Sequence, residues 1–242
     1  MPLVRTSLLA LAALALSACA VTDTTTAAVP VTRSADARPA AELRLGYFAN
    51  VTHASAVYGV GAGVLADALG GTTLKTQVFN AGPAAVEALF AGSIDAAYLG
   101  PNPAVNGFVK SRGEALRIVA GATSGGASLV VREGITAPAQ LRGQKLASPQ
   151  TGGTQDIALR SWLADQGFRV DADGGGDVVI RAQENSATLS EFQAGRIAGA
   201  WVPEPWASRL VLEGGGRVLV DEQDLWPDGR FVTTHLVVRT EF

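Results

Sequence analysis

From residue 43 onward, apolar residues change their spacing along the chain repeatedly, and each change marks a predicted element. Short apolar runs rich in β-branched residues predict strands at 43–48, 72–79, 94–99, 116–120, 128–131, 145–147, 178–182, 199–202 and 231–239. Longer segments with helical start and stop signals predict helices at 57–69, 83–90, 103–110, 155–166, 187–194 and 204–213. This alternation predicts an α/β fold with mixed, mainly parallel sheets.

The two halves of the predicted body have similar contents, which favours two lobes. We expect the chain to cross between the lobes near residues 123–127 and to return near Phe231. The first lobe is then predicted to comprise residues 43–124 plus 231–242, and the second lobe residues 125–230. Because ligands bind beyond the carboxyl ends of the strands in open α/β sheets, the loops that follow the strands are candidate binding loops.

The first 18 residues have the pattern of an export signal. Arg5 precedes an apolar run at 8–16, which is too short to cross a bilayer as a mature helix. The run ends in Leu-Ser-Ala-Cys19, which resembles the bacterial lipobox, whose cysteine is acylated. The alternative is an ordinary signal peptide with a chance cysteine. We expect lipidation at Cys19 and a flexible tether over residues 19–42.

Composition and charge narrow the function classes. The formal net charge is −3 and the sequence has no Lys/Arg cluster, which argues against nucleic-acid binding. Cys19 is the single cysteine, so an intramolecular disulfide cannot form. His53 and His235 are far apart in sequence, and HExxH, GxSxG and His/Cys cluster motifs do not occur. The acid pair Asp221 and Glu222 lies in a segment that we expect to be solvated. We therefore expect a protein that is not an enzyme and that uses no metal or cofactor.

Three stretches resemble a known family. They are residues 79–89 (FNAGPAAVEAL) leading into 92–97 (GSIDAA), residues 100–104 (GPNPA) and residues 199–206 (GAWVPEPW). In these stretches the chain is similar to the substrate-binding proteins of nitrate, sulfonate, taurine and bicarbonate ABC importers. The last stretch most resembles the sulfonate branch. Family members usually continue for several helices after the last strand, so we expect either a fragment or a first lobe without its C-terminal helices.

The resemblance implies a two-lobed type II periplasmic-binding-protein fold and a role in solute capture. An aliphatic sulfonate or taurine is the favoured ligand, with nitrate, bicarbonate or a thiamine-precursor-like heterocycle as alternatives. The implied partners are ABC permease and ATPase subunits, and the expected form is a monomer held by its lipid at the outer face of the cell membrane. Some relatives of this fold are cytoplasmic enzymes, which the export signal argues against. An adhesive surface lipoprotein would not need Gly-, Asn- and Ser-rich loops after its strands.

Candidate ligand contacts follow from the loops after the strands. In the first lobe and at the crossing they are Asn50, Thr52, His53, Gly82, Asn102, Ser124 and Gly125. Backbone N–H groups at helix starts favour anions, and a glycine lets a ligand approach the backbone closely. The alternatives are helix capping at Asn50 or Thr52, tight turns at Gly82 and Asn102, and a hinge at Gly125.

In the second lobe a Gly-rich turn before a helix is the strongest candidate for an anion site. Its candidate contacts are Thr151, Gly153, Thr154 and Gln155, and the Lys of a Walker loop is absent. Trp201 and Glu204 follow a later strand. Trp201 either packs against the ligand or belongs to the lobe core. Glu204 either faces the ligand, which would favour the amine of taurine, or caps its own helix and says nothing about the ligand.

Overall fold

The structure has two five-stranded sheets, and the first contains the first four strands of the chain and the last strand. In a computed structural model, residues 39–242 are described, and the predicted signal peptide, Cys19 and residues 19–38 of the predicted tether lie outside them. The first sheet has the order β2 (Thr73–Phe79), β1 (Glu42–Phe48), β3 (Ala96–Leu99), β10 (Val232–Arg239) and β4 (Leu116–Ser124). β1 pairs in parallel with β2 and β3, whereas β10 runs antiparallel to β3 and β4.

The second sheet repeats this arrangement. Its order is β7 (Val179–Ala182), β6 (Lys145–Ser148), β8 (Gly199–Pro203), β5 (Ala127–Arg132) and β9 (Gly216–Asp221). β6 pairs in parallel with β7 and β8, and β5 runs antiparallel to β8 and β9. The predicted α/β fold with mixed sheets is confirmed, and each sheet contains parallel and antiparallel pairs in equal number.

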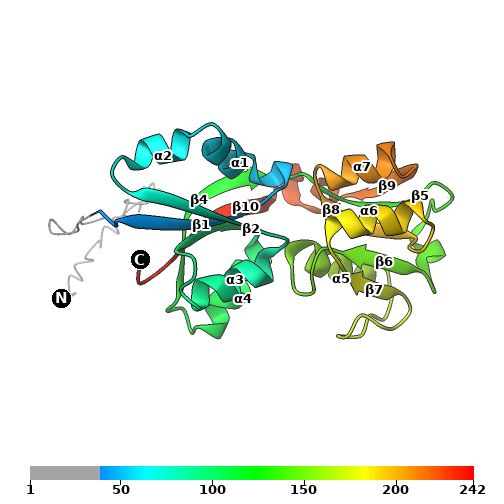
Figure 1. The fold of residues 1–242 in the computed structure, drawn as a ribbon. Helices are drawn as coiled ribbons and strands as arrows, with labels where there is room; N and C mark the ends of the chain where they lie inside the picture. The colour runs from blue at the N-terminus through cyan, green and yellow to red at the C-terminus, as the bar shows by residue number, and fades with distance from the viewer. Residues whose placement is uncertain (1–38) are drawn as a thin grey trace, which may run out of the picture. The chain divides into compact units, whose positions relative to one another are not determined.

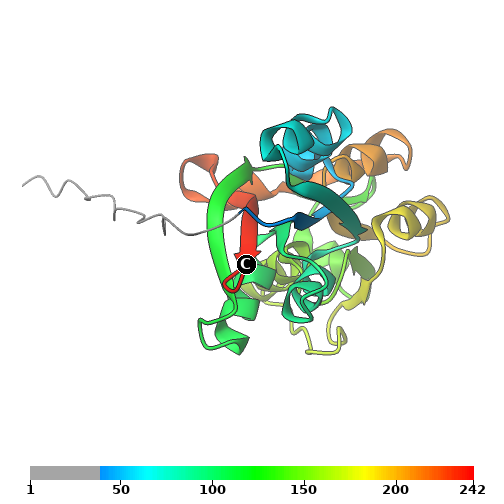
Figure 2. The same ribbon diagram turned by 60° about the vertical axis from the view of Figure 1, so that its left-hand side comes forward.

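Helices cover both faces of each sheet (Figures 1 and 2). The α-helices are α1 (Ala54–Gly61), α2 (Val64–Leu69), α3 (Gly82–Phe90), α4 (Pro101–Lys110), α5 (Thr154–Asp165), α6 (Asn185–Gln193) and α7 (Trp206–Leu212). Short 3-10 helices are η1 (Val51–His53), η2 (Pro138–Leu141), η3 (Glu222–Leu225) and η4 (Pro227–Gly229). Among the described residues, no helix has the length and apolar character needed to cross a bilayer.

The chain passes between the sheets twice. β4 ends at Ser124 and β5 begins at Ala127, so Gly125 and Gly126 form the first connection, both with positive φ. The return leads into β10, which lies beside β4 (red and green in Figure 2). The two sheets with their helices form the two lobes, and the lobe boundaries drawn from the sequence stay predictions.

Each lobe has its own apolar core. In the first lobe, buried side chains include Leu89, Ile94, Leu99 and Val237. The second lobe has a buried cluster on each face of its sheet. One includes Leu129, Leu146, Leu163 and Trp201, and the other includes Val130, Phe192, Ala200 and Leu210. Burial on both faces explains why the central strands have continuous apolar runs.

Three local predictions were wrong. The helix expected at 57–69 is two helices, because Gly63 has a left-handed φ of 76° and ends the first. A strand at 216–221 was not predicted. It is β9, an edge strand held by antiparallel pairing with β5. Glu222, interpreted as solvated, is only 3% exposed, and one of its carboxylate oxygens accepts a 2.7 Å hydrogen bond from Trp201 Nε1.

The Asp95 of the Gly-x-Ile-Asp motif has a structural role. Its buried carboxylate accepts hydrogen bonds from the backbone N–H and the guanidinium of Arg44 in β1 and from the guanidinium of Arg239 in β10. Burial raises the pKa of Asp95, but these bonds outweigh burial and lower it to about 2. The motif therefore ties the first and last strands of the described chain together.

Candidate functional site

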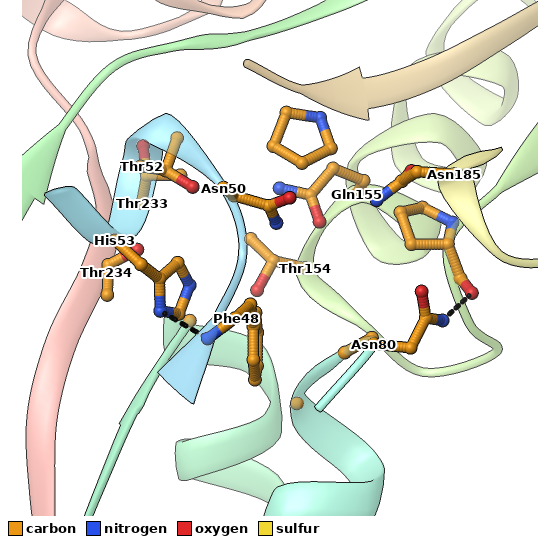
Figure 3. A pocket seen from close by; sticks show the side chains of 15 residues that line it. Phe48, Asn50, Thr52, His53, Asn80, Thr154, Gln155, Asn185, Thr233 and Thr234 are labelled. Carbon is orange, nitrogen blue, oxygen red and sulfur yellow. Dashed lines mark hydrogen bonds between the residues drawn. The ribbon is translucent and has the colours of Figure 1, made fainter. Parts of the chain in front are cut away.

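A small cavity lies between the two lobes, at the carboxyl ends of several strands (Figure 3). Its volume is about 20 Å³, which is close to the space that one water-sized group needs. It is lined by Phe48, Asn50, Thr52, His53, Asn80, Ala81, Gly82, Gly100, Thr233 and Thr234 of the first lobe, and by Pro149, Thr154, Gln155, Asn185 and Pro203 of the second. Its position agrees with the rule for ligand sites in open α/β sheets.

The lining carries no charged side chain. His53 is 2% exposed, and burial lowers its pKa to about 3, so its imidazole is neutral near pH 7. The Phe48 N–H donates a 3.3 Å hydrogen bond to Nδ1 of His53, which leaves the proton of the neutral ring on Nε2. The cavity therefore offers amides, hydroxyls and one neutral imidazole as polar groups.

Three helices begin at the cavity wall. Gly82, Thr154 and Asn185 are the first residues of α3, α5 and α6, and all three line the cavity. The free N–H groups and the dipole at a helix start favour an anion. An anion bound here would be held by partial charges and hydrogen bonds rather than by a cationic side chain.

Two lining side chains have buried oxygen atoms without a hydrogen-bond partner. These atoms are Oδ1 of Asn185 and Oγ1 of Thr234. Leaving a buried polar atom unpaired costs about 1–3 kcal/mol, so such atoms are rare without a reason. A bound ligand that hydrogen-bonds to both atoms would remove this cost.

A buried carboxylate shapes the Gly-rich turn that precedes α5. Asp156 accepts hydrogen bonds from Oγ of Ser148 (2.8 Å), from the N–H of Gly152 (2.9 Å) and from Nε of Arg160 (2.9 Å). Its charge is therefore satisfied away from the cavity. The bonds hold the turn against β6 and fix the start of α5, where Thr154 and Gln155 reach the cavity wall.

Hydrogen bonds join the two lobes around the cavity. Nδ2 of Asn80 donates to the Pro149 carbonyl at 2.9 Å, a bond drawn in Figure 3. Nε1 of Trp206 donates to Oδ1 of Asn50 at 3.1 Å, and the Val51 N–H donates to the Glu204 carbonyl at 3.0 Å. The structure therefore represents a closed arrangement of the lobes.

Six of the predicted contacts come together in this cavity. They are Asn50, Thr52, His53, Gly82, Thr154 and Gln155. They come from loops or helix starts that follow β1, β2 and β6. Their part in binding a ligand stays a prediction.

The other predicted contacts lie elsewhere. Asn102 lines a neighbouring groove between α4 and α5, which shares Thr154 with the cavity. Ser124 and Gly125 donate hydrogen bonds to the Phe231 carbonyl at the crossing. Thr151 is exposed and Gly153 is the buried N-cap of α5, and neither lines the cavity.

The sequence left two alternatives open for Trp201 and for Glu204, a ligand contact or a structural role, and the structure gives both residues the structural role. Trp201 is 0% exposed in the second-lobe core. The carboxylate of Glu204 accepts hydrogen bonds from the N–H and Oγ of Ser208, so it caps the start of α7. Neither side chain lines the cavity, so Glu204 gives no information on the ligand.

Sequence reasoning missed several polar lining residues. Thr233 and Thr234 belong to β10, where the register with β4 shifts, and no local signal places a C-terminal strand beside the cavity. Asn185 does have a signal, because it is a polar residue at a helix start shortly after a strand. The described residues contain no group of three or more His, Cys, Asp or Glu side chains that could hold a metal ion.

The described residues form two α/β lobes with a cavity lined by neutral groups between them. The NMT1-like family model matches residues 36–242, and the chain belongs to this family. A putative binding protein of Brucella abortus (strain 2308) is 29% identical over 162 residues, which are 66% of this chain and 48% of that protein. The taurine-binding periplasmic protein of Escherichia coli K12 is 28% identical over 173 residues, which are 71% of this chain and 51% of that protein.

Solved structures show the same fold. The alkanesulfonate-binding protein SsuA of Xanthomonas axonopodis pv. citri, bound to MOPS, is 25% identical with a TM-score of 0.69, over 84% of this chain and 66% of that one. The nitrate-binding protein NrtA of Synechocystis PCC 6803 is 20% identical with a TM-score of 0.67, over 84% and 56%. The chain spans about half the length of the curated relatives named above.

Proposed function

We propose that this chain is the solute-binding component of an ABC importer and captures a small organic anion between its lobes. The observation that carries the proposal is the neutral inter-lobe cavity, where helix starts meet buried oxygen atoms that have no partner. Membership of a family whose relatives include taurine- and nitrate-binding proteins supports it. Permease and ATPase subunits are the partners that such a role requires.

An aliphatic sulfonate suits the polar groups of the cavity best, and the lobes must move apart from the arrangement described here to admit it, because the cavity has a volume of only about 20 Å³. A monoanion needs donors but no full countercharge, and the hydroxyls of Thr154 and Thr234 and the helix N–H groups are donors. Oδ1 of Asn185 is an acceptor, and it suits an ammonium such as that of taurine. Nitrate, bicarbonate and a thiamine-precursor-like heterocycle remain alternatives, and of the two inorganic anions only bicarbonate has a hydrogen-bond donor, its O–H, for Oδ1 of Asn185.

A thermal-shift screen tests the ligand class. The protein is melted with ethanesulfonate, taurine, nitrate, bicarbonate and thiamine precursors in turn, because a ligand that binds only the folded state raises the melting temperature. We expect the sulfonates to give the largest rise. A rise with nitrate or a heterocycle alone would replace the ligand proposed here, and no rise with any of them would contradict capture of these anions.

Thr154 gives a direct test of the cavity. The Thr154→Val variant keeps the side-chain volume but loses the hydroxyl, and the affinity for ethanesulfonate should fall about tenfold, which is what one hydrogen bond to a charged group is worth. Titration calorimetry measures the affinity, and Thr76→Val on the exposed surface of β2 is the matched control. An unchanged affinity of the Thr154 variant would exclude this hydroxyl from the site.

The lipid anchor is proposed from the sequence alone, because Cys19 lies outside the described residues. If Cys19 is acylated, the Cys19→Ala variant should move from the membrane fraction to the soluble extracytoplasmic fraction. Immunoblotting of the fractions measures this, with Ser7→Ala as a control that keeps the cysteine. Membrane association of the Cys19 variant at the normal level would contradict the lipidation.

A further inference from the structure

We infer that Gly100 is a positioning residue that permits the two lobes to close, because its missing side chain makes room for Thr154 of the opposite lobe. The inference rests on the proposed function, since closure over a ligand is what it explains. Gly100 follows β3 of the first lobe and is the N-cap residue of α4. Thr154 begins α5 of the second lobe.

The backbone at Gly100 does not require glycine. Its φ is −79° and its ψ is 166°, an extended conformation that every L-residue adopts freely. The helix-capping position alone would favour Ser, Asp or Asn over glycine. The reason for glycine must therefore be the space around it.

That space is filled from across the cleft. A Cβ built on Gly100 would overlap Oγ1 of Thr154, and it would lie 3.1 Å from Cβ of Thr154 and 3.2 Å from the Thr233 carbonyl oxygen. Rotation of the Thr154 side chain could move Oγ1 but not Cβ, whose position is set by the backbone of a helix start that the hydrogen bond from the Gly152 N–H to Asp156 holds in place. A methyl group at position 100 would instead push the start of α5 away from the first lobe.

The same contact brings the second-lobe donors into the cavity. Gly100, Thr154 and Gln155 all line it, so the separation between Gly100 and Thr154 sets how far α5 reaches toward a ligand held by the first lobe. Gly82 differs, because a Cβ there would overlap Pro103 of its own lobe. A side chain at Gly82 would disturb the first lobe alone, whereas one at Gly100 would overlap a residue of the second lobe and make one tight first-lobe contact, 3.2 Å from the Thr233 carbonyl oxygen.

Spin labels across the cleft test the inference. Spin labels are attached to cysteines that replace two exposed residues, Glu87 of α3 and Ser186 of α6, in a Cys19→Ser background. Pulsed electron paramagnetic resonance then measures the distribution of distances between the labels, with and without ethanesulfonate, taurine or nitrate. Gly100→Ala should lose the short distance of the closed arrangement under every condition. Whichever of these anions closes the parent protein should bind Gly100→Ala at least about tenfold more weakly, because its hydrogen bonds to the second lobe are lost.

Two further variants make the result specific. Gly121→Ala, where a Cβ would meet nothing within 4 Å, should keep the short distance. Thr154→Ala in the Gly100→Ala background should restore much of it, because the overlapping hydroxyl is gone. The melting temperature of Gly100→Ala without added anion should stay near that of the parent protein, since the backbone tolerates alanine.

Each outcome decides between the two proposals. A short-distance fraction in Gly100→Ala equal to that of the parent protein overturns the inference, as does a Gly100→Ala protein that does not fold. A parent protein that shows no short distance with any probe contradicts the proposed function, and the inference on Gly100 falls with it.

Discussion

Replacing Asp95 with asparagine should lower the free energy of unfolding by about 3 kcal/mol. Removing one partner of a buried ion pair costs about 3–5 kcal/mol, because the remaining charge is left uncompensated. The lower end applies here, since the side chains of Arg44 and Arg239 are 35% and 20% exposed and can regain water. Asparagine keeps the volume of the side chain, so cavity formation does not contribute to the loss.

The loss of stability should be specific to the contacts of Asp95 with Arg44 and Arg239. Denaturant unfolding of Asp95→Asn measures it, and Glu42→Gln is the matched control in the same sheet. Glu42 pairs with Lys75 at the surface, where their side chains are 35% and 64% exposed, so its loss should cost less than about 1 kcal/mol. Equal stabilities of the Asp95 variant and the parent protein would show that the motif does not hold β1 and β10 together.

The second large effect is a pair of opposite pH dependences. Burial lowers the pKa of His53 from 6.5 to about 3, so the unfolded chain binds the proton first and stability falls as pH falls below 6.5. Burial raises the pKa of Glu222 from 4.5 to about 7, so the folded chain binds the proton first and stability falls as pH rises from 4.5 to 7. Each slope is about 1.4 kcal/mol per pH unit.

The two slopes oppose each other between pH 4.5 and 6.5. Relative to the parent protein, His53→Asn should therefore gain stability as pH falls through this window, and Glu222→Gln should lose stability. Glutamine still offers Trp201 Nε1 an acceptor, and asparagine still offers one to the Phe48 N–H. Asp95 does not interfere, because its stability contribution is lost only as pH falls from 3.8 to about 2.

Urea unfolding at half-unit pH steps measures both slopes. Burial also lowers the pKa of His235, which adds to the slope of His53, but taking each variant against the parent protein removes this contribution. If the stability of each variant relative to the parent protein did not change with pH, neither a neutral buried His53 nor a protonated buried Glu222 would be present in the folded protein. Slopes of the same sign would contradict one of the two assignments.

Much of the fold could be predicted from the sequence, because the central strands have continuous apolar runs, which are typical of strands buried on both faces. The failures are local and have physical causes. Gly63 adopts a left-handed conformation that splits one helix into two. The edge strand β9 begins at the last of three consecutive glycines, and its pairing with β5 is a tertiary contact that no local pattern shows.

The candidate site could be predicted only in part. The rule that ligands bind after strands located Asn50, Gly82 and Thr154, all of which line the cavity. The rule cannot tell which side of a buried strand faces the cleft, so it included Trp201, which faces the second-lobe core. It also cannot place Thr234, because only the antiparallel return of β10 brings that hydroxyl to the cavity.

Glu204 shows how a single side chain changes the ligand question. A carboxylate in the cleft would have selected for an amine, but Ser208 occupies both of its oxygens. Under the proposed function, the cavity would then select through neutral groups, and Oδ1 of Asn185 would be the acceptor for a taurine ammonium. The contrast between taurine and ethanesulfonate therefore reports on Asn185 rather than on Glu204.

The measurement that tests the central claim most directly is titration calorimetry of the protein with ethanesulfonate and with taurine at pH 7.5, repeated with Thr154→Val. The account predicts saturable binding of at least one of them to a single site, with an affinity about tenfold lower in the variant. Binding that Thr154→Val leaves unchanged would place the ligand outside the inter-lobe cavity. No binding of either compound by a folded sample would contradict the capture of small sulfonates.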